Sequence, residues 1–372
     1  MMRIGIVCYP SVGGSGFLAT KLGLELAKME HEVHFFSYET PHLLQTGHLH
    51  GIKVHIVDVT SYALFKYPPY TLSLTSSLIE ESDNLDIINV HYAIPHAASA
   101  FLTKIQTGLP FVVTLHGSDV HTVGPHPAYR HSVSVTLKQA DALTSVAQYL
   151  SKEAEQNFGI SNVPVIPNFV DAEQFTRSKY KDECCIFEPA GYDILHVSNF
   201  RAIKRTTDLI KAMSIVKQAI PEVHLYLVGE GPERIAAGYL VGKHRLEKTV
   251  TFLGMRRDIP TLLYSSSIFC LPSELEAAPL SILEAMAMEV PVVASRAGGI
   301  PEIAIEGETA LLCEPLNPTD LAEKLIKLLQ NKQMQRTFGE KARERVLEYH
   351  DPIKITLMYE KLYEEVLNKI NR

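Results

Sequence analysis

Short apolar and β-branched runs alternate with longer segments of helical periodicity from one end of the chain to the other. Strand-like runs cover residues 4–8, 33–37, 54–59, 86–90, 111–115, 142–146, 163–166, 194–198, 224–229, 250–253, 268–271, 290–294 and 310–313. Such alternation predicts parallel sheets covered by helices on both faces. The chain is therefore predicted to be an α/β protein with two doubly wound, Rossmann-like domains facing a central cleft.

The alternation lapses in the polar stretch FTRSKYKDECCIFEPAGYD, which follows Pro167-Asn168. We predict an N-terminal domain over residues 1–168, a linker over 169–192 and a C-terminal domain over 193–350. Residues 351–372 are amphipathic, and we expect them to pack back on the N-terminal domain. A length of 372 residues exceeds the usual size of one hydrophobic core. In open α/β sheets, ligands bind at the carboxyl ends of the strands.

The composition is that of a globular protein, with 46% hydrophobic and 21% charged residues and a net charge of -7. An acidic chain is a poor partner for nucleic acid or an anionic membrane, so an anionic ligand would need a local basic pocket. The N-terminal MMRIGIVCYP lacks the apolar core of a secretion signal, which predicts a cytoplasmic protein. The five cysteines have no paired zinc spacing, and we expect reduced, structural thiols.

The stretch SELEAAPLSILEAMAMEVPVVAS places two acidic residues around a predicted helix start. Pro279 suits the first turn of a helix, because its missing N–H is no loss there. Glu276 then precedes the helix and Glu284 lies inside it. Free N–H groups at a helix start attract a phosphate, and nearby carboxylates suit hydroxyl groups better than further anions. The pattern predicts a sugar nucleotide as ligand, although two glutamates on a solvated helix face would give the same pattern.

A glycine-rich loop, YPSVGGSG, follows the first predicted strand and precedes a helix. Glycines let backbone N–H groups approach a phosphate without a Cβ in the way. Gly14, Gly16 and Ala19 also satisfy the dinucleotide fingerprint G-x-G-x-x-A, with Glu39 as a ribose ligand. The loop before these glycines is about five residues long, whereas the fingerprint turn is tight. A nicotinamide oxidoreductase is therefore the less favoured alternative.

Histidines recur every five residues from position 116 to position 131. Five is not a helical ligand spacing and no cysteine or acidic cluster joins them, so no metal site is predicted. His116 differs because it closes the strand FVVTLH and opens the turn HGSD, at the carboxyl end where a ligand is expected. A capped turn explains HGSD without a function as well. His91-Tyr92 ends the strand DIINV in the same way.

The sequence NFRAIKR, residues 199–205, places three cations directly after the first strand of the second predicted domain. Cations at this position would neutralise a diphosphate or carboxylates, although a charge run is more often a solvated face. The turn at Gly229 and the strand end at Met255 are expected to line a nucleotide base through backbone groups.

Together these features resemble the retaining glycosyltransferases of the GT-B fold, over nearly the whole chain. The resemblance rests on the paired loops, the H-G-x-D turn, the basic cluster and the E-x7-E spacing of Glu276 and Glu284. More narrowly, CYPSVGGSG, FKYPPY, HYAIPHA, LHGSD, VSNFR and GGIPE resemble the members of this family that begin bacillithiol biosynthesis. That resemblance implies retaining transfer of GlcNAc from UDP-GlcNAc to the 2-hydroxyl of L-malate, without a metal or other cofactor.

The resemblance also implies a role for each matched residue. In the catalytic set, His116 would hydrogen-bond the donor sugar, Arg201 and Lys204 would stabilise the leaving UDP, and Glu276 would bind sugar hydroxyls. Glu284 would bind the ribose. The other donor-binding positions would be Gly14, Ser15, Gly16, Asn199, Arg205, Gly229, Met255, Pro279 and Leu280. The acceptor would contact Ser15, Tyr92, Ser118 and Arg201, and the donor's own phosphate oxygen would take its proton on the same face.

Three positions depart from the family pattern. Ala278-Pro279 stands where relatives have Phe-Gly or a similar pair, which removes one N–H donor. Ser118 replaces a usual threonine and keeps the hydroxyl. The basic cluster is more tightly spaced, so either Arg201 or Arg205 could join Lys204 at the diphosphate. A relative with another acceptor or donor sugar and a non-catalytic nucleotide-sugar-binding protein remain alternatives, and a homo-oligomer is compatible with the sequence.

Overall fold

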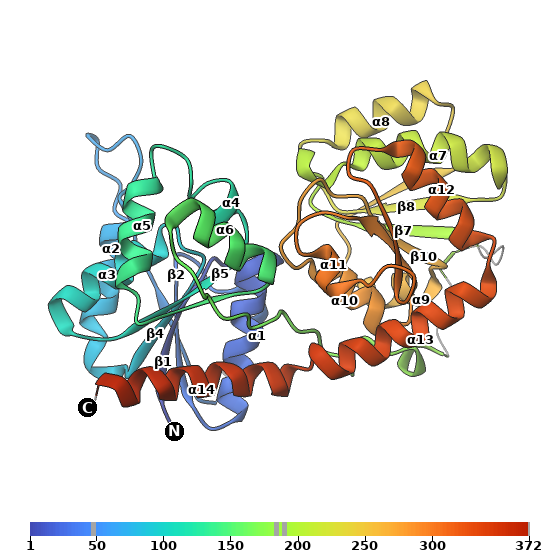
Figure 1. Ribbon diagram of the computed structural model, residues 1–372. Coiled ribbons are helices and arrows are strands. Elements are labelled where there is room, and N and C mark those ends of the chain that lie inside the picture. Colours follow the sequence, from blue (N-terminus) through green and yellow to red (C-terminus); the bar gives the residue numbers. More distant parts are fainter. Residues whose placement is uncertain (46–49, 182–185, 188–191, 371–372) are drawn as a thin grey trace. The chain divides into compact units, whose positions relative to one another are not determined.

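The computed structural model describes residues 1–45, 50–181, 186–187 and 192–370 (Figure 1). The chain divides into two compact units, the first made of Met1–Asn168 with Pro352–Arg372 and the second of Phe169–Asp351. Each unit contains one six-stranded sheet whose neighbouring strands are all parallel. The prediction of two doubly wound sheets is confirmed.

The sheet of the first unit has the order β3-β2-β1-β4-β5-β6. Its strands are β1 (Arg3–Val7), β2 (Glu32–Ser37), β3 (Ile52–Ile56), β4 (Ile87–His91), β5 (Phe111–Leu115) and β6 (Ala142–Ser145). Its helices are α1 (Gly14–Lys28), η1 (His42–Leu44), α2 (Tyr70–Glu80), η2 (Ser82–Asn84), α3 (His96–Thr107), α4 (Ser118–His121), α5 (Arg130–Gln139), α6 (Gln148–Phe158) and α14 (Pro352–Ile370). The strand order reverses between β1 and β4, so the loops after these strands meet at a switch point where ligands bind.

One predicted strand of the first unit is wrong. Residues 163–166 form no strand, and Val165 makes only an isolated bridge with Ser145. Pro164 and Pro167 flank this bridge, and because proline has no backbone N–H it cannot extend a strand ladder.

The sheet of the second unit has the order β12-β11-β10-β7-β8-β9, with its switch point between β7 and β10. Its strands are β7 (Asp193–Val197), β8 (His224–Val228), β9 (Val250–Gly254), β10 (Ile268–Leu271), β11 (Val292–Ser295) and β12 (Ala310–Cys313). Its helices are η3 (Arg177–Tyr180), η4 (Ala202–Lys204), α7 (Thr206–Ala219), α8 (Arg234–Lys243), α9 (Ile259–Ser265), α10 (Leu280–Ala287), α11 (Ile300–Ile303), α12 (Pro318–Leu329) and α13 (Lys332–Tyr349). Of the predicted linker, residues 182–185 and 188–191, including Cys184 and Cys185, lie outside the described residues.

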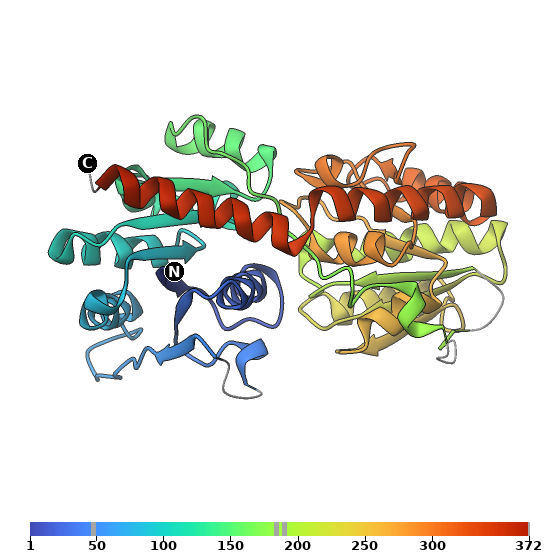
Figure 2. The same cartoon turned by 90° about the horizontal axis from the view of Figure 1, so that it is seen from below.

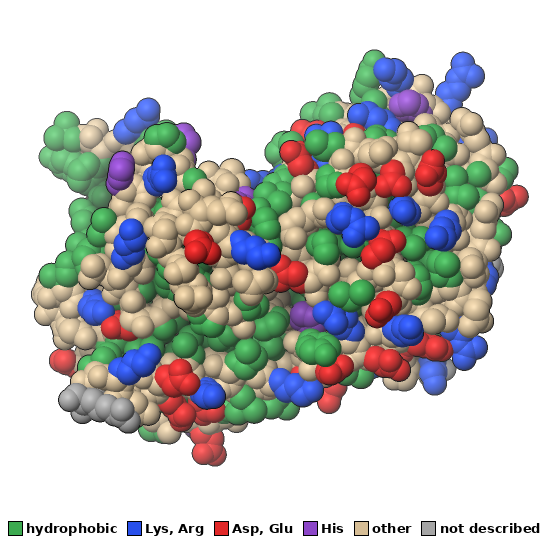
Figure 3. All heavy atoms as spheres, in the orientation of Figure 1, with side chains coloured by type: hydrophobic (Ala, Val, Ile, Leu, Met, Phe, Trp, Pro, Cys, Tyr) green, Lys and Arg blue, Asp and Glu red, His purple; other side chains and the backbone are tan. Residues whose placement is uncertain are grey.

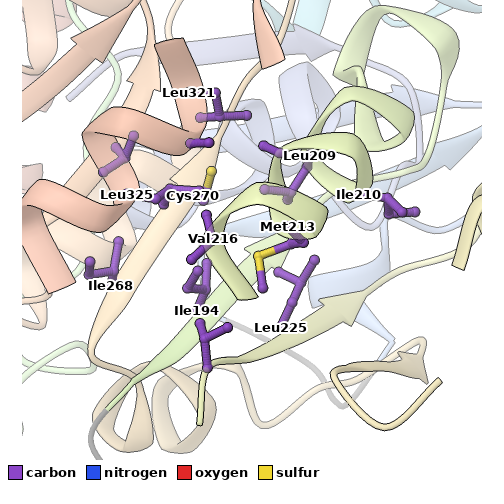
Figure 4. Close-up of a cluster of buried hydrophobic side chains, with 14 of the residues drawn as sticks. Ile194, Leu209, Ile210, Met213, Val216, Leu225, Ile268, Cys270, Leu321 and Leu325 are labelled. Atoms are coloured by element: carbon purple, nitrogen blue, oxygen red, sulfur yellow. The ribbon is translucent and has the colours of Figure 1, made fainter. Parts of the chain in front are cut away.

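Figure 4 shows the core of the second unit, in which apolar side chains from the sheet meet one stripe of α7 and one of α12. Leu209, Met213 and Val216 recur at helical spacing on α7 and are completely buried. They lie with Ile194 of β7 and Ile268 of β10 in one cluster. This packing anchors β7 and β10, the two strands at the switch point, to α7.

Helix α14 belongs to the first unit, although its sequence follows α13 of the second. Figures 1 and 2 show it running along the first unit beside α1, and these two helices are in contact. Ile355, Tyr359, Tyr363 and Val366 form its buried stripe, at the spacing expected of one helix face. The helix thus places two tyrosine side chains inside the first unit.

The surface mixes both signs of charge. Acidic and basic side chains are intermingled on the face drawn in Figure 3. In the part of the chain that the structure describes, no helix has the length and apolar character that crossing a bilayer requires.

Candidate functional site

The loop between β1 and α1 carries the predicted phosphate-binding glycines. Helix α1 begins at Gly14, with Gly13 as its N-cap, so Gly14, Ser15 and Gly16 form its first turn and its leading N–H groups have no helical acceptor. Gly16 is buried, and a Cβ there would collide with the carbonyl oxygen of Tyr9. Gly16 therefore allows the loop to fold tightly over the helix start.

Replacing Gly16 with alanine is expected to lower the free energy of unfolding by about 2 kcal/mol. Alanine gains about 1 kcal/mol in helix propensity, but the collision is with the backbone, which cannot move aside without shifting the loop. Gly13→Ala is the matched control, because Gly13 has an extended backbone and open space where the methyl group would lie. Urea unfolding of both variants tests this expectation, and equal effects at the two positions would contradict it.

The HGSD turn after β5 is organised by Asp119, a buried residue of α4. Its carboxylate accepts hydrogen bonds from the backbone N–H groups of Ala93 at 3.0 Å, His116 at 3.2 Å and Gly117 at 2.7 Å. Burial raises the pKa of Asp119, and these donors act in the opposite direction by stabilising the carboxylate. Asp119 therefore ties the loop after β5 to the loop after β4.

The two predicted acceptor residues of these loops lie together. The hydroxyl groups of Tyr92 and Ser118 are 2.5 Å apart, and both side chains are half-buried. The Tyr9 ring, from the glycine loop, packs edge-on against Tyr92 with 5.6 Å between ring centroids. The loops after β1, β4 and β5 thus form one polar surface at the switch point of the first unit.

His116 sits at the end of a buried chain of polar side chains. Its Nε2 lies 3.0 Å from Nδ1 of His91, and Nε2 of His91 lies 3.2 Å from the amide nitrogen of Asn89. The same amide nitrogen donates to the hydroxyl of Tyr363 on α14 at 2.7 Å. Burial lowers the pKa of His116 to about 3 and holds that of His91 well below its ordinary value. Both imidazoles are therefore neutral near pH 7.

Acid is expected to destabilise the protein through its buried histidines. Burial lowers the pKa of His96 and His196 to about 4, as it lowers those of His91 and His116. An unfolded histidine titrates near 6.5, so below that pH the unfolded chain binds more protons than the folded protein. The stabilising contribution is complete above about pH 6.5 and is lost as the pH falls towards 4, at about 1.4 kcal/mol per pH unit for each histidine.

Urea unfolding at a series of pH values between about 7 and 5 measures this loss. His96→Gln should reduce the slope, whereas His131→Gln, at an exposed position on α5, should leave it unchanged. An unfolding free energy that is constant over this range would contradict the expectation.

In the second unit, Lys204 and Glu276 form an ion pair with 2.5 Å between Nζ and Oε1. Ser273 donates to the same carboxylate oxygen at 2.7 Å. The backbone carbonyl of Glu276 accepts from the N–H of Gly299 at 2.9 Å, and a Cβ at Gly298 would collide with that carbonyl. The loop after β11 therefore packs directly on the segment from Glu276 to Glu284, which we call the acidic cassette.

Pro279 is the N-cap of α10, with a ψ of 121°, and the helix begins at Leu280. The prediction that Pro279 lies in the first turn is wrong by one residue, because its extended ψ places it outside the helix. Glu284 is half-buried on α10 and lies eight residues after Glu276. The relation predicted between the two glutamates, one before the helix and one inside it, is present.

The two arginines of the basic cluster have different surroundings. Arg205 is paired with Asp208 at 2.7 Å and lies 3.8 Å from Glu274. Arg201 is exposed and has no ion-pair partner among the residues that the structure describes. The charge of Arg205 is therefore already compensated within the protein, whereas that of Arg201 is not.

The remaining predicted donor residues lie at the carboxyl ends of β7, β8 and β9. Gly229 has a φ of 119°, donates to the carbonyl of Gly254 at 2.8 Å and packs against the backbone of Ser198, where a Cβ would collide. Asn199 and Met255 are exposed. The loops thus lie side by side, with Gly229 fixing their approach.

One group of side chains in the described residues is close enough to hold a metal, and it contains no predicted site residue. His34, His55 and Glu81 have potential ligand atoms within 4.8 Å of one another. His34 also bonds to Glu32 at 3.0 Å and to His55 at 3.0 Å, so these groups form a hydrogen-bonded network as they stand.

Sequence reasoning did not identify several residues that organise the site, among them Asn89, His196, Ser273 and Tyr363. His196 is buried in β7 and contacts the carbonyl of Cys270 at 2.9 Å and the hydroxyl of Ser198 at 2.8 Å. Asn89 did leave a signal. Asn89 and His91 are polar residues two apart in an otherwise apolar strand, which places both on the same face of the sheet.

Comparisons with known proteins match nearly the whole chain. The family model described as Glycosyltransferase Family 4 matches residues 12–174, and the model described as Glycosyl transferases group 1 matches residues 188–345. N-acetyl-alpha-D-glucosaminyl L-malate synthase of Bacillus anthracis is 38% identical over 98% of this chain and 97% of its own. An uncharacterized glycosyltransferase of Methanocaldococcus jannaschii is 26% identical over 91% of both chains.

Solved structures share the fold. A sucrose-phosphate synthase from Thermosynechococcus elongatus matches with a TM-score of 0.84 and 21% identity, over 99% of this chain and 100% of its own. The Anabaena protein HepE, solved in complex with UDP-glucose, matches with a TM-score of 0.82 and 21% identity, over 99% of this chain and 100% of its own.

Proposed function

Because the chain belongs to the GT-B glycosyltransferases, we propose that it transfers GlcNAc from UDP-GlcNAc to the 2-hydroxyl of L-malate. The reaction would retain the anomeric configuration, need no metal, take place in the cytoplasm and begin bacillithiol biosynthesis. The observation that supports this choice of donor and acceptor is the 38% identity, over 98% of the chain, with an N-acetyl-alpha-D-glucosaminyl L-malate synthase. The matched region spans both units and therefore includes the loops to which we assign the donor and the acceptor.

Lys204 and Glu276 are suited to bind the two parts of the donor that the reacting glycosidic bond joins. Lys204 would bind the diphosphate, and Glu276 would bind the sugar. Within the described residues, the bonds to Lys204 and Ser273 both use Oε1 of Glu276, which leaves Oε2 for a sugar hydroxyl. The ammonium group of Lys204 has three donors and uses one on Glu276, so the others can reach a phosphate oxygen. A fixed cation stabilises the negative charge that develops on UDP as the glycosidic bond breaks.

Between the two arginines, we assign the second cationic role to Arg201. Its charge has no counterpart within the described residues, while Arg205 is held by Asp208. An uncompensated guanidinium can bind the diphosphate or a malate carboxylate, which accept bidentate hydrogen bonds. Arg205 would then act by supporting the loop.

The polar surface of the first unit supplies groups of the kind that the acceptor and the sugar need. Tyr92 and Ser118 offer two adjacent hydroxyl groups for malate. His116 is neutral, so it can hydrogen-bond a sugar hydroxyl without adding charge. We expect the donor's own phosphate oxygen to take the proton of the attacking hydroxyl on the same face.

The deciding experiment incubates the protein with UDP-GlcNAc and a panel of hydroxy acids. We expect UDP release with L-malate, an α-linked product by NMR and an unchanged rate after treatment with EDTA. Turnover with another acceptor alone would overturn the malate assignment and leave the family intact. Binding of UDP-GlcNAc without turnover would indicate a binding protein, and binding of NAD(H) at Gly14–Gly16 would support the oxidoreductase alternative.

A further inference from the structure

The buried chain from Tyr363 to His116 has a definite direction of hydrogen-bond donation. An amide nitrogen can only donate, so Asn89 donates both to the Tyr363 hydroxyl at 2.7 Å and to Nε2 of His91 at 3.2 Å. The contact at the other end of the amide agrees with this orientation, because the hydroxyl of Thr114 donates to Oδ1 of Asn89 at 3.2 Å. Thr114 in turn accepts from Thr144 at 3.2 Å.

This direction determines where the imidazole protons lie. If Nε2 of His91 accepts a hydrogen bond, the single proton of the neutral ring is on Nδ1, and it is donated to Nε2 of His116 at 3.0 Å. The proton of His116 must then be on its own Nδ1. The ring nitrogen that is not engaged by His91 is therefore a donor.

We propose that Asn89, His91 and Tyr363 are positioning residues that lock His116 in its Nδ1–H tautomer, so that His116 presents a hydrogen-bond donor to an oxygen of the bound sugar. The role of His116 rests on the proposed function, while the tautomer follows from the hydrogen bonds alone. Asn89 and His91 lie on β4. Tyr363 lies on α14 and connects this helix to their hydrogen-bond network. Through Tyr363, helix α14 therefore contributes to the choice of tautomer at His116, which follows β5.

Burial makes this arrangement stable. Asn89, His91 and Tyr363 are each no more than 2% exposed. A reversed direction would require the amide of Asn89 to turn over, which would bring its nitrogen to the hydroxyl that now donates to Oδ1. Thr114 would then have to exchange donor and acceptor roles with its neighbours. The orientation of the Asn89 amide therefore sets the tautomer of His116 two hydrogen bonds away.

The first test needs no substrate. Two-dimensional NMR of the protein with ¹⁵N-labelled histidine distinguishes Nδ1–H from Nε2–H, and the spectrum of His116→Gln assigns the signals of His116. We expect both His116 and His91 as Nδ1–H tautomers in the wild-type protein. An Nε2–H tautomer at His116 would overturn the proposal even if GlcNAc transfer proceeds as expected.

The second test compares replacements at His91. His91→Leu removes the donor and is expected to lower kcat about 10²-fold. His91→Asn places an amide N–H near the former Nδ1 position and should recover most of that loss. Equal loss of kcat in the two variants, with both folded, would overturn the positioning role.

The third test removes the hydroxyl of Tyr363, which lies at the opposite end of the hydrogen-bond network from His116. Tyr363→Phe should lower kcat about 10-fold and populate the second tautomer of His116, because the amide of Asn89 loses one acceptor. Thr356→Val is the matched control, since it removes a buried hydroxyl of α14 that donates to the carbonyl of Pro352 in its own helix. If Tyr363→Phe changes only the melting temperature, as Thr356→Val is expected to do, the proposal fails. If the wild-type protein transfers no sugar, the NMR measurements still decide the tautomer, so the two failures can be told apart.

Discussion

Replacing Lys204 with methionine is expected to lower kcat for sugar transfer by about 10³-fold, with the protein still folded. Methionine keeps most of the length of the side chain and removes the cation. The ammonium group is held at 2.5 Å from Glu276 with only 20% of its side chain exposed, so its position is fixed before the donor binds. A preorganised cation that faces developing charge contributes more than one that must be ordered during the reaction.

Lys211→Met is the matched control for this variant. Lys211 pairs with Asp208 at 2.9 Å, and its side chain is 45% exposed on α7, a helix that begins directly after the basic cluster. The same change of charge is expected to leave kcat within about twofold there, since exposed ion pairs contribute little. Steady-state kinetics with UDP-GlcNAc and L-malate measure both variants. Equal kcat values for the two variants would show that Lys204 takes no part in the reaction.

Replacing Glu276 with glutamine is expected to lower kcat/KM by about 10²-fold. The amide can still accept one hydrogen bond from Ser273, but it no longer holds Lys204 by charge and offers a weaker acceptor to a sugar hydroxyl. Glu274→Gln is the control, because Glu274 is 48% exposed and lies 3.8 Å from Arg205.

A double variant, Lys204→Met with Glu276→Gln, separates one functional pair from two independent residues. If the pair acts as a unit, the double variant should lose little more activity than Lys204→Met alone, because groups that act together are strongly non-additive. Losses that multiply would instead mean that each residue contacts the donor separately.

The hydrophobic pattern predicted the sheets because buried parallel strands are nearly continuous apolar runs. The same rule failed at residues 163–166, where Pro164 and Pro167 prevent a ladder. The rule that ligands bind at carboxyl ends of strands placed His116, the basic cluster and the acidic cassette near the switch points of their units. Strand order is needed to see that these loops are neighbours, and sequence alone does not give it.

The partners of the site residues could not be predicted, since they come from distant parts of the chain. Tyr363 lies 274 positions after Asn89, and Glu276 lies 72 positions after Lys204. A nearer partner does have a signal in the sequence. Asp208 follows Arg205, the N-cap of α7, by only three positions, and this pair explains why Arg205 is less suited than Arg201 to bind an anionic ligand.

The discontinuous first unit has a consequence for synthesis of the protein on the ribosome. Domains usually fold in the order in which they emerge, N-terminal first. Here the chain of the second unit is complete at Asp351, whereas the first unit still lacks α14, whose Tyr363 bonds to Asn89 deep in its sheet. The half of the molecule that is translated first is therefore completed only after the second unit, and one of its faces stays uncovered until α14 has been synthesised.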